Sequence, residues 1–90
     1  MNVQAYYHKS QGIAEVCVSV LGQTIDIDRI EIADILDNTF EVQPGTDPTI
    51  TRQVRFSDLN SDQQEEAIEQ AVRDYCNGQG NEVTEYHTYN

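Results

Sequence analysis

Basic side chains are scarce in this sequence. Its 90 residues include only 5 lysines and arginines against 16 aspartates and glutamates, which gives a formal net charge of −11 at pH 7. Proteins that bind nucleic acid or an anionic membrane directly need basic patches. We therefore expect no direct binding to nucleic acid and no binding to a membrane. A macromolecule that is attracted by charge should carry a basic surface.

Cysteines and long apolar runs are also few. Two cysteines, Cys17 and Cys76, are too few for the disulfide framework of a small secreted protein. The longest apolar stretch, 16–21, is interrupted by Ser19 and is far shorter than the roughly 20 residues that span a bilayer. The first residues contain no apolar stretch like that of a signal peptide. These absences predict a cytoplasmic protein.

Sequence motifs for catalysis or metal binding are missing as well. There is no nucleophile elbow, phosphate-binding glycine loop or dinucleotide fingerprint. A catalytic thiol needs a nearby histidine, and both histidines, His8 and His87, lie in terminal segments. Residues 26–28 look like the start of a calcium loop, but the required glycine and glutamate do not follow. We therefore expect no catalytic residues, no metal site and no cofactor; an enzyme or metal protein using the two histidines and the carboxylates is a minor alternative.

Apolar side chains, at 38% of the chain, predict a thin core, and their spacing predicts strands. Alternation over 14–20 and 24–27, around a turn at 21–23, predicts a β-hairpin with Ile25 and Ile27 facing inward. Phe40 and Val42, a Pro/Gly loop over 44–48 and a return over 49–56 predict a second hairpin. Residues 3–7 predict a short strand, and the tail 82–90 predicts an edge strand or a frayed end.

The main helix is predicted over 62–77. Ser61 as N-cap with Gln64 would form a capping box, and Gly78 would end the helix. One apolar stripe recurs at helical spacing through Ile68, Ala71, Val72, Tyr75 and Cys76. We therefore predict an α+β fold, a single domain over 1–90 with a small antiparallel sheet of about four to five strands in two hairpins, and one main amphipathic helix packed on one face.

The stretch 28–37 does not continue the second strand of the first hairpin regularly. Ile25 and Ile27 occupy odd positions, whereas Ile30 and Ile32 occupy even ones, so one regular strand cannot bury all four. Either a bulge lies near 28–29, or a short helix starts at Asp28 with a capping box completed by Glu31. The capping box slightly favours the helix.

Carboxylates gather in two clusters. The helical cluster, over 62–74, contains one basic residue, Arg73, and the earlier segment, over 26–41, contains one, Arg29. The helical cluster, over about 18 Å, carries one net charge per about 4.5 Å, which approaches the one phosphate per about 3.4 Å of a DNA strand. The earlier segment, if extended, is much sparser. The residues that we expect to bind a partner are Asp62, Glu65, Glu66, Glu69, Asp26, Asp28, Glu31 and Asp34.

Two functional hypotheses follow, beside the simpler interpretation that acidity only keeps the protein soluble. In the first, carboxylates occupy phosphate sites on a basic, nucleic-acid-binding protein. In size, acidity and α+β pattern the chain is similar to phage-encoded inhibitors of host nucleic-acid machinery, including anti-restriction and anti-CRISPR proteins; this resemblance is one of composition, without a shared motif. In the second, a non-enzymatic adaptor or small structural module binds through an apolar edge bearing Tyr6, Tyr7, Tyr86 and Tyr89. Under either hypothesis the protein is a monomer or a small homo-oligomer.

Overall fold

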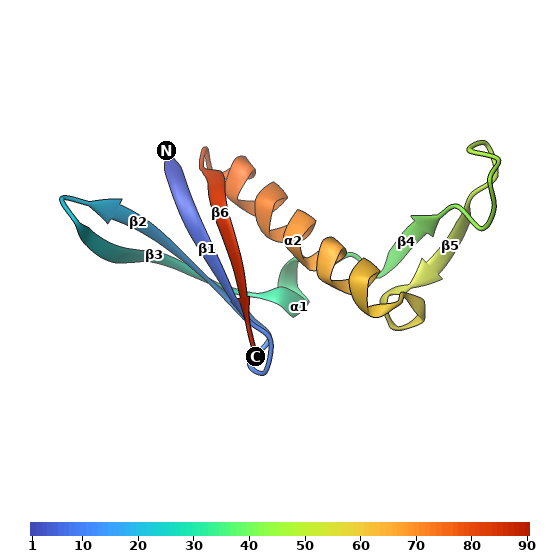
Figure 1. Cartoon of the computed structure of the whole chain (residues 1–90), viewed down its shortest axis with the longest axis horizontal. Helices are drawn as coiled ribbons and strands as arrows, with labels where there is room; N and C mark the ends of the chain where they lie inside the picture. The colour runs from blue at the N-terminus through green and yellow to red at the C-terminus, as the bar shows by residue number, and fades with distance from the viewer.

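The computed structural model describes all 90 residues and contains two sheets and one long helix (Figure 1). The larger sheet has the strand order β3-β2-β1-β6, and the smaller one pairs β4 with β5. Helix α2 packs on one face of the larger sheet, so the predicted α+β fold is confirmed. In chain order the elements are β1 (Asn2–His8), β2 (Ile13–Val20), β3 (Gln23–Glu31), α1 (Ile32–Ile35), β4 (Thr39–Val42), β5 (Arg52–Arg55), a 3₁₀ turn (Phe56–Asp58), α2 (Ser61–Gly78) and β6 (Glu82–Tyr89).

The C-terminal segment forms an edge strand. Strand β6 pairs with β1 in parallel, from Asn2 opposite Glu82 to His8 opposite Tyr89. Parallel pairing follows from the crossover, because α2 carries the chain back along the sheet before β6 begins. The larger sheet is therefore mixed, whereas the sequence predicted an antiparallel one.

The first predicted hairpin is present, but its tip is not buried. Val20 pairs with Gln23 across Leu21 and Gly22, and both turn residues have positive φ, 52° and 79°. This two-residue turn suits the twist of the strands. Ile25 and Ile27 are 46% and 40% exposed, so their predicted inward placement is wrong. The tip of the hairpin extends past the end of α2, which leaves these side chains uncovered (Figure 1).

A β-bulge in β3 accounts for the shift of its isoleucines from odd to even positions. Val16 lies opposite Asp28 and Cys17 opposite Asp26, so Ile27 is the extra residue. After the bulge Ile30 points into the core, where it is 4% exposed. The predicted helix start at Asp28 is wrong, because β3 continues to Glu31 and the four-residue α1 begins only afterwards. The Asp28 carboxylate accepts a hydrogen bond from the next backbone N–H instead.

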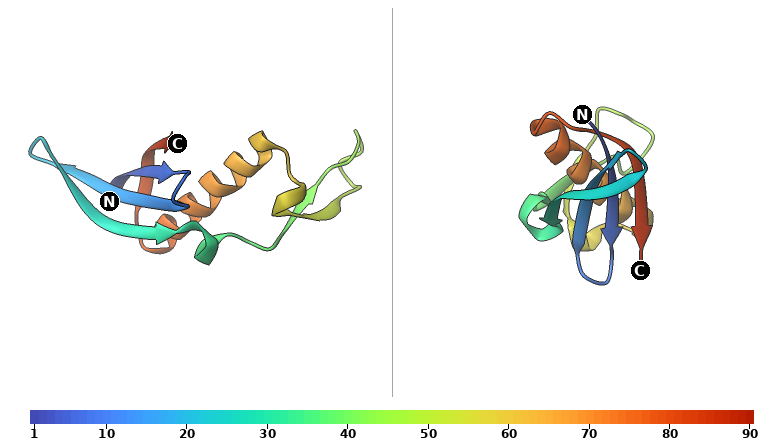
Figure 2. Two further views of the ribbon diagram at one scale, coloured as in Figure 1. Left: turned by 90° about the horizontal axis from the view of Figure 1, so that it is seen from below. Right: turned by 90° about the vertical axis from the view of Figure 1, so that its left-hand side faces the viewer.

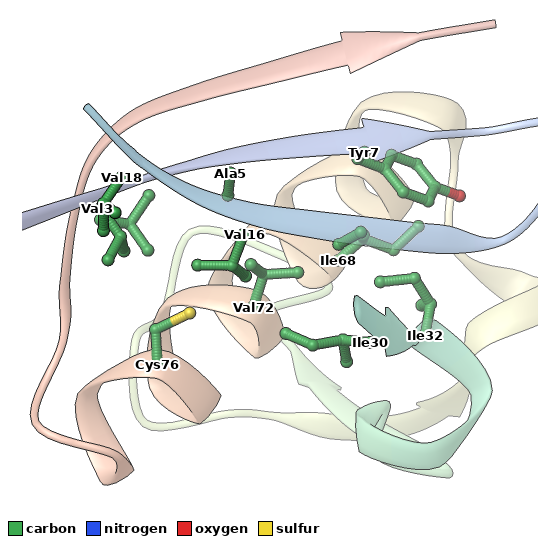
Figure 3. Packing of buried hydrophobic residues seen from close by; sticks show 12 residues of the cluster. Val3, Ala5, Tyr7, Val16, Val18, Ile30, Ile32, Ile68, Val72 and Cys76 are labelled. Carbon is green, nitrogen blue, oxygen red and sulfur yellow. The ribbon is translucent and has the colours of Figure 1, made fainter. Parts of the chain in front are cut away.

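The core between α2 and the sheet is small and entirely apolar (Figure 3). Only 14 of 90 residues are buried, and none of them is polar or charged in type. From α2, Ile68, Val72 and Cys76 point toward the sheet, where Val16 lies beside Val72. Because so small a core gives a low free energy of unfolding, one badly placed substitution can unfold the protein.

The capping residues of α2 differ from the prediction by one or two positions. Asn60, not Ser61, is the N-cap: its Oδ1 accepts from the Gln63 N–H at 2.8 Å, and Gln63 Oε1 accepts from the Asn60 N–H at 3.1 Å. At the other end Gly80, with φ of 81°, is the left-handed residue, so the helix continues through Gly78. The Asn81 N–H then reaches the Cys76 carbonyl at 2.9 Å, as in a Schellman motif.

Two alanine substitutions test which residue caps α2. Asn60→Ala removes the side-chain acceptor and should lower the free energy of unfolding by about 1 kcal/mol. Ser61→Ala, one residue later, should change it by less than about 0.5 kcal/mol. Urea unfolding of both variants, followed by circular dichroism, measures the difference. A larger loss from Ser61→Ala than from Asn60→Ala would mean that Ser61 is the N-cap.

The second hairpin projects away from the main sheet. Strands β4 and β5 pair only with each other, and Phe40 stacks at a tilt on Phe56 with ring centroids 6.1 Å apart. Ile50, within the predicted return strand 49–56, precedes β5 and is 56% exposed. The radius of gyration is 14.9 Å, against about 12 Å for a compact chain of this length. The molecule is consequently elongated, with the sheet and the hairpin at opposite ends of α2 (Figure 2).

Candidate functional site

Helix α2 carries the predicted acidic residues on a flank that faces solvent. Asp62, Glu65 and Glu66 are exposed, and Glu69 is half-buried. Ile68, Val72 and Cys76, on the adjacent side of the helix, pack against the sheet. The helix is capped at both ends and packs on the sheet from Ile68 to Cys76, so the carboxylates project from a well-formed helix.

The same flank forms one side of a hollow of about 580 Å³ between α2 and β6. Arg73 closes part of it, because its Nε lies 2.9 Å from Glu69 Oε2 and its Nη1 donates to the Val83 carbonyl at 2.8 Å. Lys9 lies 3.8 Å from the Glu65 carboxylate in an exposed pair, which contributes little. No ion pair engages Asp62 or Glu66. We call this surface the acidic hollow; its carboxylates are Asp62, Glu65, Glu66 and Glu69.

The other predicted acidic residues lie elsewhere. Strand β3, which carries Asp26, Asp28 and Glu31, is at the opposite edge of the sheet from β6. Asp26 shares a face with Cys17, while Asp28 lies opposite the buried Val16 and so faces the helix side. Asp34 is exposed on α1. These four carboxylates therefore do not join the acidic hollow in one surface.

A groove runs along a third flank of α2, toward α1 and β4. Its volume is about 860 Å³, and its apolar lining includes Leu36, Phe40, Val42, Ala67, Ala71 and Tyr75. Four carboxylates line it as well, from Asp37, Glu41, Glu66 and Asp74, and no lysine, arginine or histidine does. We call this surface the apolar groove. Glu66 belongs to both surfaces.

The apolar groove was not predicted from the sequence. Ala71 and Tyr75 were assigned to the same buried stripe as Val72, but they are only half-buried. The signal was nevertheless present: Ala67, Ala71 and Tyr75 form an i, i+4, i+8 row beside the row of Ile68, Val72 and Cys76. The sheet covers one row, and the short segment α1–β4 flanks the other.

The tyrosines expected at one edge are divided between two faces. Tyr6 stacks on His87 at 5.4 Å and on Tyr89 at 6.1 Å, on the sheet face away from α2. His8 extends this row, since its ring lies 5.8 Å from Tyr89. Tyr7 is instead buried in the core. Tyr86 lines the acidic hollow, where burial, with Glu69 nearby, raises its pKa to about 12.

Both cysteines are buried free thiols. Burial and the Asp26 carboxylate, which accepts a hydrogen bond from Cys17 Sγ at 3.0 Å, raise the pKa of Cys17 to about 12. Burial, with Asp28 nearby, also raises the pKa of Cys76. Because the thiolate is the nucleophile, these environments hold both side chains in their unreactive form at neutral pH.

Thiol labelling checks this arrangement. At pH 8 the native protein should react with a disulfide reagent at least about a hundredfold more slowly than the protein unfolded in guanidinium chloride, where both thiols become accessible. Cys17→Ser and Cys76→Ser variants assign any residual reaction to one position. Rapid labelling of Cys76 in the native state would mean that its side of α2 is not packed on the sheet.

No group of three or more histidine, cysteine or acidic side chains is placed together to hold a metal ion. Neither helix combines the length and apolar character needed to cross a bilayer. Comparisons with protein-family models, curated proteins and solved structures find no match to this chain.

Proposed function

We propose that this is a non-enzymatic interaction protein that binds and blocks a basic, nucleic-acid-binding surface of another protein. The carboxylates of the acidic hollow take the places that phosphates occupy on that surface. In this proposal the protein acts in the cytoplasm, as phage-type inhibitors of host defence such as anti-restriction or anti-CRISPR proteins do.

One observation carries the proposal: a capped helix presents Asp62, Glu65 and Glu66 to solvent, and Asp62 and Glu66 have no cationic partner within the chain. Clustered, unpaired charges on a fixed backbone are suited to charge-assisted hydrogen bonds with arginine and lysine. The net charge of −11 adds long-range attraction toward a basic surface and repulsion from nucleic acid.

The outer face of the sheet supports a second candidate, an adaptor that binds through aromatic side chains. Tyr6, His87 and Tyr89 form a stacked row there. Aromatic rings of this kind are frequent anchors of protein interfaces. A partner held there would bury aromatic surface, and its affinity would depend little on ionic strength.

Capture from a nucleic-acid-binding fraction tests the first candidate. Cell proteins that bind DNA-cellulose are eluted with salt, desalted, and passed over the immobilised protein, with and without duplex DNA as competitor. We expect a retained protein that duplex DNA displaces and that Asp62→Lys/Glu65→Lys fails to retain. A protein that stays bound in excess DNA but is lost with Tyr6→Ala/Tyr89→Ala would support the adaptor instead.

A further inference from the structure

The apolar groove is an uncovered surface with apolar lining residues on two facing sides. Ala67 and Ala71 lie one turn apart on α2, and their small side chains leave the helix backbone approachable between Tyr75 and the start of the helix. Phe40 and Val42 of β4 form the facing wall. The volume of about 860 Å³ is enough for several side chains.

The length of the groove favours a helical occupant. Along α2 its lining residues extend from Gln63 to Tyr75, which is about 18 Å at ~1.5 Å per residue. A partner helix of about 12 residues has the same length. A helix laid in such a groove inserts apolar side chains at i, i+3, i+4 and i+7, and the rows of small and aromatic residues on α2 have matching spacing.

Charge then selects the occupant. The groove is lined by Asp37, Glu41, Glu66 and Asp74, without a cation. A second copy of this chain would bring its own net charge of −11 against these carboxylates, which opposes self-association through this face. A helix with lysines and arginines beside its apolar stripe would bring opposite charges to these carboxylates.

We propose that the apolar groove binds a basic amphipathic helix of a protein partner, with the apolar stripe on the floor and the cations against the carboxylates. This inference rests on the proposed function for the basic character of the partner. It adds a specific apolar contact to an association that is otherwise driven by charge. The acidic hollow attracts the partner, and the groove determines which partner is retained.

A synthetic probe tests this directly. The probe is a 14-residue amidated peptide of leucine and lysine with helical spacing and one tryptophan on its apolar face. The protein contains no tryptophan, so the peptide's fluorescence alone reports burial. Two matched peptides serve as controls: the same composition in alternating order, and a leucine–glutamate version of the helical one.

We expect binding of the helical lysine peptide with a blue-shifted tryptophan emission, and binding at least about tenfold weaker for both control peptides. Ala71→Arg, whose stem can lie along the open groove, should weaken binding at least about tenfold while the protein stays folded. Chemical-shift changes should gather at Leu36, Phe40, Ala67 and Tyr75. Equal affinity for the two lysine peptides, or shift changes confined to β6, would overturn the proposal.

The two proposals fail in different ways. If Asp62→Lys/Glu65→Lys abolishes peptide binding at 0.3 M salt while Ala71→Arg does not, the groove proposal is wrong and the acidic hollow remains the binding surface. If the peptide binds the groove but duplex DNA displaces no captured partner, the groove proposal holds and the proposed blocking of a nucleic-acid site is wrong.

Discussion

Val72→Asp should unfold the protein at 25 °C, so that heating shows no cooperative transition. Val72 is 0% exposed, and no buried residue of the core is polar or charged in type, so the new carboxylate would find no partner there. An unpaired buried charge typically costs about 3–5 kcal/mol. A domain of this size has a free energy of unfolding of roughly 4–13 kcal/mol, and a core this small places it toward the lower end.

Thermal unfolding followed by circular dichroism measures this effect. Gln70→Asp provides the control, since it introduces the same side chain at an exposed position of the same helix and should cost less than about 1 kcal/mol. A Val72→Asp protein that melts cooperatively within a few degrees of the wild type would show that α2 is not packed on the sheet through this residue.

Reversal of charge in the acidic hollow should have the largest effect on binding. Asp62→Lys/Glu65→Lys removes two exposed carboxylates that the groove does not use. Stability should fall by only about 1 kcal/mol, because the pair of Glu65 with Lys9 is exposed and the dipole term of Asp62 is small. Affinity for a captured basic partner should fall by about a hundredfold, since like charges then face each other.

A second double reversal separates local from global charge. Glu31→Lys/Asp34→Lys changes the net charge by the same amount, but these residues lie near β3, at the other edge of the sheet. We expect it to lower affinity by less than about fivefold, through weaker long-range attraction only. Equal losses from both double variants, measured by isothermal titration, would mean that net charge and not the acidic hollow drives binding.

The parts of this fold that were predicted from sequence depend on local signals. Period-2 alternation located β2 and the first half of β3, and the stripe through Ile68, Val72 and Cys76 located α2 to within one residue at each end. The N-cap was missed because Asn60 and Ser61 both accept hydrogen bonds well, and only the backbone decides between them.

The remaining features depend on contacts between distant segments. Nothing local indicates that β6 runs parallel to β1, or that the tip of the β2–β3 hairpin extends beyond α2 and leaves Ile25 exposed. The acidic helix flank was predicted, whereas its separation from Asp26 and Asp28 follows from strand order. The groove was missed because a second apolar row on a helix does not reveal whether another element covers it.

Salt dependence tests the central claim most directly. The dissociation constant of the captured partner is measured between 0.05 and 0.5 M NaCl for the wild type and for Asp62→Lys/Glu65→Lys. If α2 carboxylates carry the interaction, wild-type affinity should fall by at least about tenfold over this range, and the variant should show weak binding with a shallower dependence. A wild-type dissociation constant that stays constant across the range, or identical slopes for the two proteins, would contradict binding through the acidic hollow.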